Sequence, residues 1–153
     1  MALGSNLGDR RAHLNFAAGR LRQFLGDLSV SRYHETAPVG VEGHQPDFLN
    51  AAAVGTTTLT AREVLSGLLA IELERGRERP YPGAARTLDL DLVLFGDEII
   101  DEPPDLIVPH PRFRDRAFVL APLAEIAPAW RDPVSGYTIA ELRRHIVRPA
   151  EGE

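Results

Sequence analysis

The sequence contains no cysteine and no lysine, and each absence excludes a group of mechanisms. Without cysteine there is no disulfide framework, no thiolate metal site and no cysteine nucleophile. Without lysine there is no Schiff-base chemistry and no phosphate-loop lysine. All 17 basic residues are therefore arginines, which clamp phosphate oxygens in a planar, bidentate manner. The base composition of the source genome would explain the same bias, but the chemical exclusions hold in either case.

Long apolar runs and an excess of positive charge are also missing. No segment approaches the roughly 20 apolar residues that span a bilayer, and no basic stretch followed by an apolar run opens the chain. We therefore expect a cytoplasmic protein with no membrane association. The formal net charge of -5 argues against general nucleic-acid binding. A chain of 153 residues is long enough for its own core, so we expect one domain over residues 1–153, acting as a monomer.

The hydrophobic pattern predicts a strand, a helix, two strands, a helix and a strand, followed by C-terminal additions. Asp9 is a candidate helix N-cap, and Thr60 with Glu63 forms a capping box. This order is typical of an α+β ferredoxin-like βαββαβ core, with helices packed on an antiparallel sheet. The expected helices cover residues 9–26, 60–75, 115–126 and 139–146, and the expected strands cover 1–3, 28–35, 48–59, 86–95 and 106–108.

Two aspartates interrupt the otherwise apolar stretch RTLDLDLVLF, residues 86–95. In a strand, the leucines at 88, 90, 92 and 94 share one face, and Asp89 and Asp91 share the other. The two carboxylates would lie about 7 Å apart and repel by about 2 kcal/mol at an effective dielectric of about 20. A cation between them reverses that sign, and hard oxygen ligands without nearby Cys or His favour Mg²⁺. A solvated strand end is the alternative.

Arginines gather on both sides of this acidic strand. Between residues 75 and 86 four arginines face one glutamate, and between residues 110 and 116 three arginines face one aspartate. Basic groups around paired carboxylates indicate a polyphosphate bound together with metal. Each arginine run alone is also typical of a solvated surface. No Gly-rich phosphate loop, dinucleotide fingerprint or hydrolase nucleophile elbow is present, so any nucleotide is bound by other means.

Glu72 occupies a place where the pattern calls for an apolar residue. It lies on the helical stripe of Leu65 and Leu68. Glu72 is therefore either a paired core carboxylate or a group that supports the metal site from behind. The residues alone leave both interpretations open.

Further motifs accompany the aspartate strand, namely ALGSNLGDR, HQPDFLNAA, ELERGR and VPHPRFRDRAFVLAPLAEIAP. In this order, and over nearly the whole chain, they resemble the 6-hydroxymethyl-7,8-dihydropterin pyrophosphokinase family of folate biosynthesis. The resemblance implies a ferredoxin-like α+β fold, ATP as co-substrate and two Mg²⁺ ions. The implied reaction transfers the pyrophosphoryl group of ATP to the hydroxymethyl group of 6-hydroxymethyl-7,8-dihydropterin, which gives AMP and the pterin diphosphate.

The resemblance also implies roles for individual residues. Asp89 and Asp91 match the Mg²⁺ ligands, and Asn50 would bond the amide-like edge of the pterin. The implied catalytic residues are Arg77, Arg86, Asp89 and Asp91; those at ATP are Arg79, Arg86, His110, Arg114 and Arg116; those at the pterin are Thr36, Val39, Phe48, Asn50 and Phe118. The sequence departs from the family at Gly83, near where an aromatic residue often approaches adenine, and at Asp105, where arginine can stand.

Two other functions use the same sequence features. A palm-type nucleotidyl transferase also pairs aspartates on a ferredoxin-like sheet, but it needs a further acidic ligand and a basic template groove, which the overall acidity disfavours. A non-catalytic ferredoxin-like nucleotide-binding or regulatory domain would leave the aspartates without a catalytic role. In the enzyme, the loops over residues 37–47 and 76–85 are expected to close over the substrates and exclude water.

Overall fold

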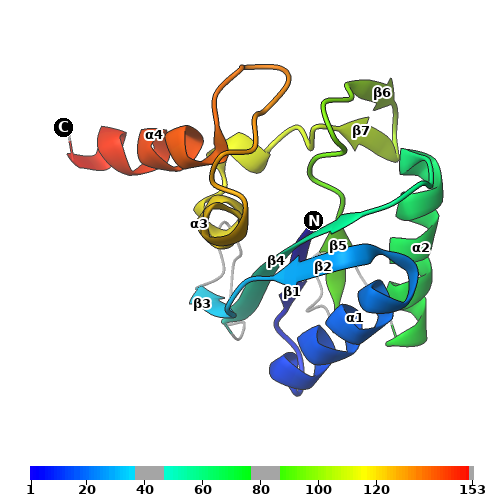
Figure 1. Cartoon of the computed structure of the whole chain (residues 1–153). Coiled ribbons are helices and arrows are strands. Elements are labelled where there is room, and N and C mark those ends of the chain that lie inside the picture. The colour runs from blue at the N-terminus through cyan, green and yellow to red at the C-terminus, as the bar shows by residue number, and fades with distance from the viewer. Residues whose placement is uncertain (37–46, 77–86, 152–153) are drawn as a thin grey trace.

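The computed structural model describes residues 1–36, 47–76 and 87–151 of the chain (Figure 1). The elements are β1 (Ala2–Ser5), α1 (Arg10–Phe24), β2 (Gly26–Val30), β3 (His34–Thr36), β4 (Phe48–Thr56), α2 (Ala61–Glu74), β5 (Asp89–Asp91), β6 (Ile100–Glu102), β7 (Leu106–Val108), a 3-10 turn η1 (Phe113–Asp115), α3 (Ala117–Ile126) and α4 (Ile139–Glu151). From β1 to β5 the elements follow the predicted order of strand, helix, two strands, helix and strand, except that the second predicted strand is divided into β2 and β3.

The main sheet has the strand order β2-β4-β1-β5, and β3 pairs with the first half of β4. The pairs β1 with β4, β1 with β5, and β2 with β4 are all antiparallel. The first strand, β1, thus lies between β4 and β5, which flank α2 in the second half of the βαββαβ motif. This is the ferredoxin-like arrangement, so the predicted fold class is confirmed. β6 and β7 form a separate two-stranded sheet.

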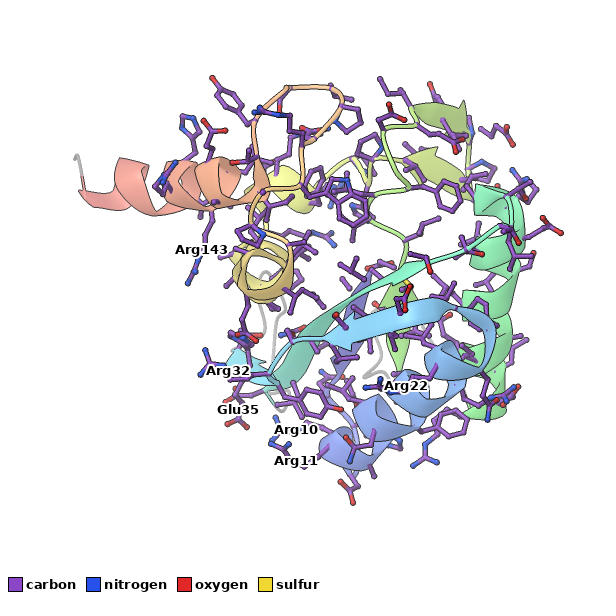
Figure 2. The ribbon with its side chains drawn as sticks, viewed as in Figure 1. Arg10, Arg11, Arg22, Arg32, Glu35 and Arg143 are labelled. Carbon is purple, nitrogen blue, oxygen red and sulfur yellow. The ribbon has the colours of Figure 1, made fainter. Side chains whose placement is uncertain are left out.

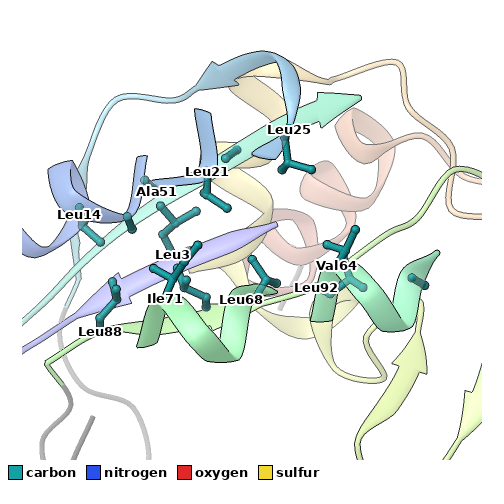
Figure 3. Close-up of a cluster of buried hydrophobic side chains, with 14 of the residues drawn as sticks. Leu3, Leu14, Leu21, Leu25, Ala51, Val64, Leu68, Ile71, Leu88 and Leu92 are labelled. Atoms are coloured by element: carbon teal, nitrogen blue, oxygen red, sulfur yellow. The ribbon is translucent and has the colours of Figure 1, made fainter. Parts of the chain in front are cut away.

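One face of the sheet forms the larger core. Leu14 and Leu21 of α1 and Leu68 of α2 pack there against Leu3 of the sheet (Figure 3). Leu90 belongs to the same cluster. On the other face, α3 packs against β4 and contributes to a second cluster that includes Ala52 (Figure 1). The sheet is therefore covered on both faces, and Leu90 of β5 faces the larger core.

Both predicted helix starts are confirmed. Asp9 accepts a hydrogen bond from the Ala12 N–H at 3.1 Å, which caps α1. Thr60 accepts from the Glu63 N–H at 3.1 Å, and Glu63 accepts in return from the Thr60 N–H at 2.9 Å. These caps are local in sequence, so they can be read without knowledge of the tertiary structure.

The single strand predicted over residues 28–35 is wrong, because β2 and β3 are separate strands that share β4 as their partner. The division occurs at Ser31. Its N–H donates to the Ala52 carbonyl, while its side-chain hydroxyl accepts from the Ala52 N–H at 2.9 Å. The hydroxyl thus takes the place of a backbone carbonyl, and the regular ladder is interrupted there.

The strand predicted over residues 86–95 is shorter than expected. Within the described residues, β5 is assigned to Asp89–Asp91 and pairs with β1 alone. Beyond it the alternation stops, because Val93 and Leu94 both join the cluster of α3. The helix predicted from residue 115 begins instead at Ala117, after η1. None of the described helices is long and apolar enough to cross a membrane.

Candidate active site

The sheet register brings the carboxylates and the amide predicted to bind substrates onto one face. Gly4 of β1 is paired with Asn50 of β4 on one side and with Asp89 of β5 on the other. Directly paired residues of antiparallel strands point their side chains to the same face. Asn50 and Asp89 therefore share a face and are separated by the single strand that carries Gly4.

Asp89 and Asp91 lie two residues apart on β5, so both carboxylates project from this face. Both residues are half-buried, while Leu90 between them is 5% exposed and fixed in the larger core. Within the described residues, no group of three or more His, Cys, Asp or Glu side chains could hold a metal ion. Two carboxylates nevertheless suit Mg²⁺, which keeps several waters and completes its shell with substrate phosphates.

Glu72 supports this strand from the helix behind it. Its side chain is 2% exposed, and one carboxylate oxygen accepts a hydrogen bond from the Leu90 N–H at 2.7 Å. A buried carboxylate is costly unless it is hydrogen-bonded. Glu72 is thus a hydrogen-bonded core carboxylate whose partner lies between the two aspartates, and its support of a metal site stays a prediction.

His110 lies half-buried beside the aspartates. Its backbone N–H donates to the Val93 carbonyl at 2.9 Å, and its Nδ1 accepts from the Arg112 N–H at 3.2 Å. Burial lowers the pKa of His110, the charges of Arg116 and Arg112 lower it further, and Asp89 opposes them. The neutral ring carries its proton on Nε2, because Nδ1 is an acceptor. His110 can therefore donate one hydrogen bond from Nε2 near Asp89 and Arg116.

The described residues predicted at the pterin lie on three neighbouring elements. Asn50 is 6% exposed, and its Nδ2 donates to the Thr36 hydroxyl at 2.5 Å. Phe48 is paired with Thr36 across β3 and β4. Phe118 lies on α3, which packs on β4, and the Arg116 guanidinium lies 5.5 Å from the centre of the Phe118 ring. An amide, a hydroxyl and two aromatic rings are therefore available on one side of the aspartates.

Arg114 has a different environment from the other residues predicted at ATP. Its Nη2 donates to Asp132 Oδ1 at 2.9 Å, and its Nε donates to the second oxygen of the same carboxylate. Asp132 is fully buried. Burial would raise the pKa of Asp132, but hydrogen bonds from Arg114, Ser135 and the Val134 N–H outweigh it and lower the pKa to about 2. Arg114 thus anchors η1 to the turn after Asp132, and its contact with ATP stays a prediction.

Asp132 and Arg10 were not among the residues that the sequence indicated. The run DPVSG signals an Asx turn at Asp132, and the structure shows it as a 3.0 Å bond from the Val134 N–H. Arg10 donates to the Glu35 carboxylate at 2.6 Å (Figure 2). It also donates to the Asp47 carbonyl at 2.9 Å. No local sequence pattern predicts these two contacts of Arg10, because they join α1 to β3 and to the residue before β4.

Four predicted site residues lie outside the described residues. They are Val39, Arg77, Arg79 and Arg86, and their roles stay predictions. The two loops expected to close over the substrates lie almost entirely in the same segments.

A cavity of about 220 Å³ opens next to the aspartates. Asp91 and His110 line it, together with apolar side chains from α2, β5 and β7, among them Leu65, Leu90 and Leu106. Asp105 is a third polar residue of the lining, and a cavity that combines apolar side chains with a few polar groups suits a flat heterocycle. Asn50, Gly4 and Asp89 form a row of paired residues across three strands. This row and the cavity share strand β5, which carries Asp89 and Asp91.

Residues 1–128 match the family model for 7,8-dihydro-6-hydroxymethylpterin-pyrophosphokinase. A 2-amino-4-hydroxy-6-hydroxymethyldihydropteridine pyrophosphokinase of Bacillus subtilis is 48% identical over 128 residues, which cover 82% of this chain and 75% of that protein. The protein of the same name from Pseudomonas aeruginosa is 42% identical over 144 residues, which cover 93% and 87%.

Solved structures agree on the fold. A Plasmodium falciparum HPPK-DHPS chain, crystallised with pterin and p-hydrobenzoate, superimposes with a TM-score of 0.71 over 99% of this chain. The sequence identity is 15%, and this chain spans 45% of that longer one. At that identity the likeness concerns the fold alone.

Proposed function

Because the chain belongs to the 7,8-dihydro-6-hydroxymethylpterin-pyrophosphokinase family, we propose that the sheet face carrying Asn50 and Asp89 is its active site. The enzyme transfers the pyrophosphoryl group of ATP to the hydroxymethyl group of 6-hydroxymethyl-7,8-dihydropterin in folate synthesis. One observation carries the placement of the site: an amide suited to the pterin and a carboxylate suited to a metal-bound phosphate are separated by one strand.

The pterin lies against the Asn50 end of this row. The Asn50 amide keeps one N–H donor and its carbonyl acceptor beyond the bond to Thr36, so it can pair with an edge that both accepts and donates. Phe48 and Phe118 supply aromatic faces for the flat ring system. Val39 completes the pocket in this proposal.

The triphosphate lies against the Asp89 end. Asp89 and Asp91 hold Mg²⁺, which when bound neutralises phosphate charge and orients the reacting oxygens. Arg116 and the Nε2–H of His110 donate to phosphate oxygens, and the neutral imidazole adds a donor without a further charge. The adenine occupies the cavity that Asp91 and His110 border. Arg77, Arg79, Arg86 and Arg114 are further phosphate contacts in this proposal.

The reaction forms a bond between the pterin hydroxymethyl oxygen and the β-phosphorus of ATP. The bond from that phosphorus to the oxygen bridging to the α-phosphate breaks, and AMP leaves. The side chains contribute mainly by positioning and by charge neutralisation, which dominate catalysis in phosphoryl transfer. Arg77 and Arg86 act on the charge that develops on the transferred group.

Product analysis tests this function. The protein is incubated with ATP, MgCl₂ and 6-hydroxymethyl-7,8-dihydropterin, and the nucleotides are separated by anion-exchange chromatography. We expect AMP and pterin diphosphate in equal amounts, and no AMP when the pterin is omitted. ADP as the product would contradict the function, and nucleotide binding without turnover would favour a non-catalytic ferredoxin-like domain.

A further inference from the structure

We propose that Gly4 is a positioning residue for the pterin site, because the lack of a side chain there lets the Asn50 amide keep its place. This inference rests on the proposed function and deepens it. Gly4 is paired directly with Asn50 and shares its face of the sheet. A Cβ atom built on Gly4 would lie 3.2 Å from Asn50 Oδ1 and 3.9 Å from Phe48 Cδ1. The first distance is tighter than nine in ten real Cβ contacts.

The backbone does not require glycine at this position. Four described glycines, at 8, 76, 96 and 136, have positive φ angles, and Gly4 is not among them. Gly4 lies in a regular strand, where glycine is normally unfavourable because it packs no side chain. Space, and not backbone conformation, is therefore the physical reason for glycine between Asn50 and Asp89.

The Asn50 amide cannot move away freely from an added methyl group. Asn50 is 6% exposed, and its Nδ2 is bonded to the Thr36 hydroxyl on the neighbouring strand. A rotation that relieves the contact at Oδ1 also displaces Nδ2 from Thr36. The amide would then present a shifted donor and acceptor to the pterin, and misplaced polar groups lose binding steeply.

An added Cβ at Gly4 would crowd residues of β4 alone among its nearest neighbours, so the substitution should affect pterin binding and not ATP binding. The three heavy atoms nearest to the added Cβ belong to Asn50, Phe48 and Leu49, all on β4. No atom of Asp89 is among them. A methyl group at position 4 therefore disturbs the pterin end of the site and leaves the ATP end in place.

The test compares Gly4→Ala with Gly55→Ala in steady-state assays of AMP formation. Gly55 lies at the far end of β4, where an added Cβ would crowd the Gly26 carbonyl at 3.1 Å and Leu25 at 3.2 Å. Gly55→Ala is thus a matched strand substitution with a comparable packing defect away from the site. We expect Gly4→Ala to raise the KM for the pterin about tenfold or more and to change the KM for ATP about twofold at most. Gly55→Ala should lower the Tm and change neither KM.

Equal changes in the two KM values of Gly4→Ala, or a pterin KM no higher than that of Gly55→Ala, would overturn the inference. A wild-type protein that forms no AMP would instead refute the proposed function. Thermal unfolding gives a second test that needs no activity. If the Asn50 amide is the obstacle, Gly4→Ala should lower the Tm less in an Asn50→Ala background than in the wild type. The same loss of Tm in both backgrounds would also overturn the inference.

Discussion

The buried carboxylate of Glu72 accepts a hydrogen bond from the Leu90 N–H at 2.7 Å, so α2 holds the residue between Asp89 and Asp91. The described pairing of β5 is to β1 alone, through three residue pairs. A bond from the helix side therefore adds a second constraint on a short strand. The strand geometry sets the spacing of the two aspartates, while this bond and the burial of Leu90 fix the position of the strand that carries them.

We predict that Glu72→Ala destabilises the protein by about 1–3 kcal/mol, because it leaves the buried Leu90 N–H without its acceptor. The kcat should fall as well, because the aspartates lose a support. Glu72→Gln keeps a carbonyl oxygen and should have a smaller effect on both. Urea unfolding and AMP formation measure the two effects. Glu74→Gln, on the exposed side of the same helix, is the control, and an equal loss in Glu74→Gln would refute this role.

Asp89→Asn and Asp91→Asn should each abolish turnover while the Tm stays near that of the wild type. Each substitution keeps the size of the side chain and removes the charge that attracts Mg²⁺. Magnesium titration followed by calorimetry in the presence of a non-hydrolysable ATP analogue should show weaker metal binding. Asp97→Asn, on an exposed turn, should behave as the wild type. An active Asp89→Asn/Asp91→Asn double variant would rule out the metal-binding role.

His110 should titrate below the ordinary histidine value of about 6.5 in the metal-free protein. Burial and the charges of Arg116 and Arg112 lower its pKa, while Asp89 raises it. Asp89→Asn should therefore lower the pKa of His110 further, and Arg116→Gln should raise it. Two-dimensional NMR of the imidazole resonances across pH, with EDTA present, measures all three proteins. A wild-type titration at or above the ordinary value would contradict this environment.

The ion pair of Asp132 with Arg114 should make stability depend on pH in the acid range. The pKa of Asp132 is lowered to about 2 from an ordinary 3.8, so its stabilisation is present above about pH 4 and is lost as the pH falls through about 2. A shift of this size corresponds to about 2 kcal/mol. Asp132→Asn should be less stable than the wild type at pH 7, and the difference should shrink between pH 4 and pH 2. A difference that is constant over this range would contradict the assignment.

Features that depend on neighbours in the chain could be predicted from the sequence. The caps at Asp9 and Thr60 and the alternation of Leu88, Asp89 and Leu90 involve residues at most four positions apart, and the structure contains them. The break in the strand predicted over residues 28–35 could not be predicted. It occurs where the Ser31 hydroxyl replaces a backbone carbonyl opposite Ala52, which is 21 residues away. A pattern of hydrophobicity carries no signal for such a substitution of partners.

The site shows the same division. The carboxylate pair follows from strand periodicity, whereas the pterin residues were available only from the family resemblance. The place of Gly4 between Asn50 and Asp89 depends on the register of three strands, which no single segment encodes. The bond from Glu72 to Leu90 spans 18 residues and links a helix to a strand, so the sequence showed only that Glu72 was out of pattern.

The proposed reaction moves two phosphoryl units together from ATP to the pterin. Parallel reactions with ATP carrying ³²P in the β-phosphate and ATP carrying ³²P in the γ-phosphate test this claim. We expect both labels to appear in the pterin product, in equal amounts and at the same rate, with AMP unlabelled. A product that carries only the γ label, with the β label retained in ADP, would contradict the claim.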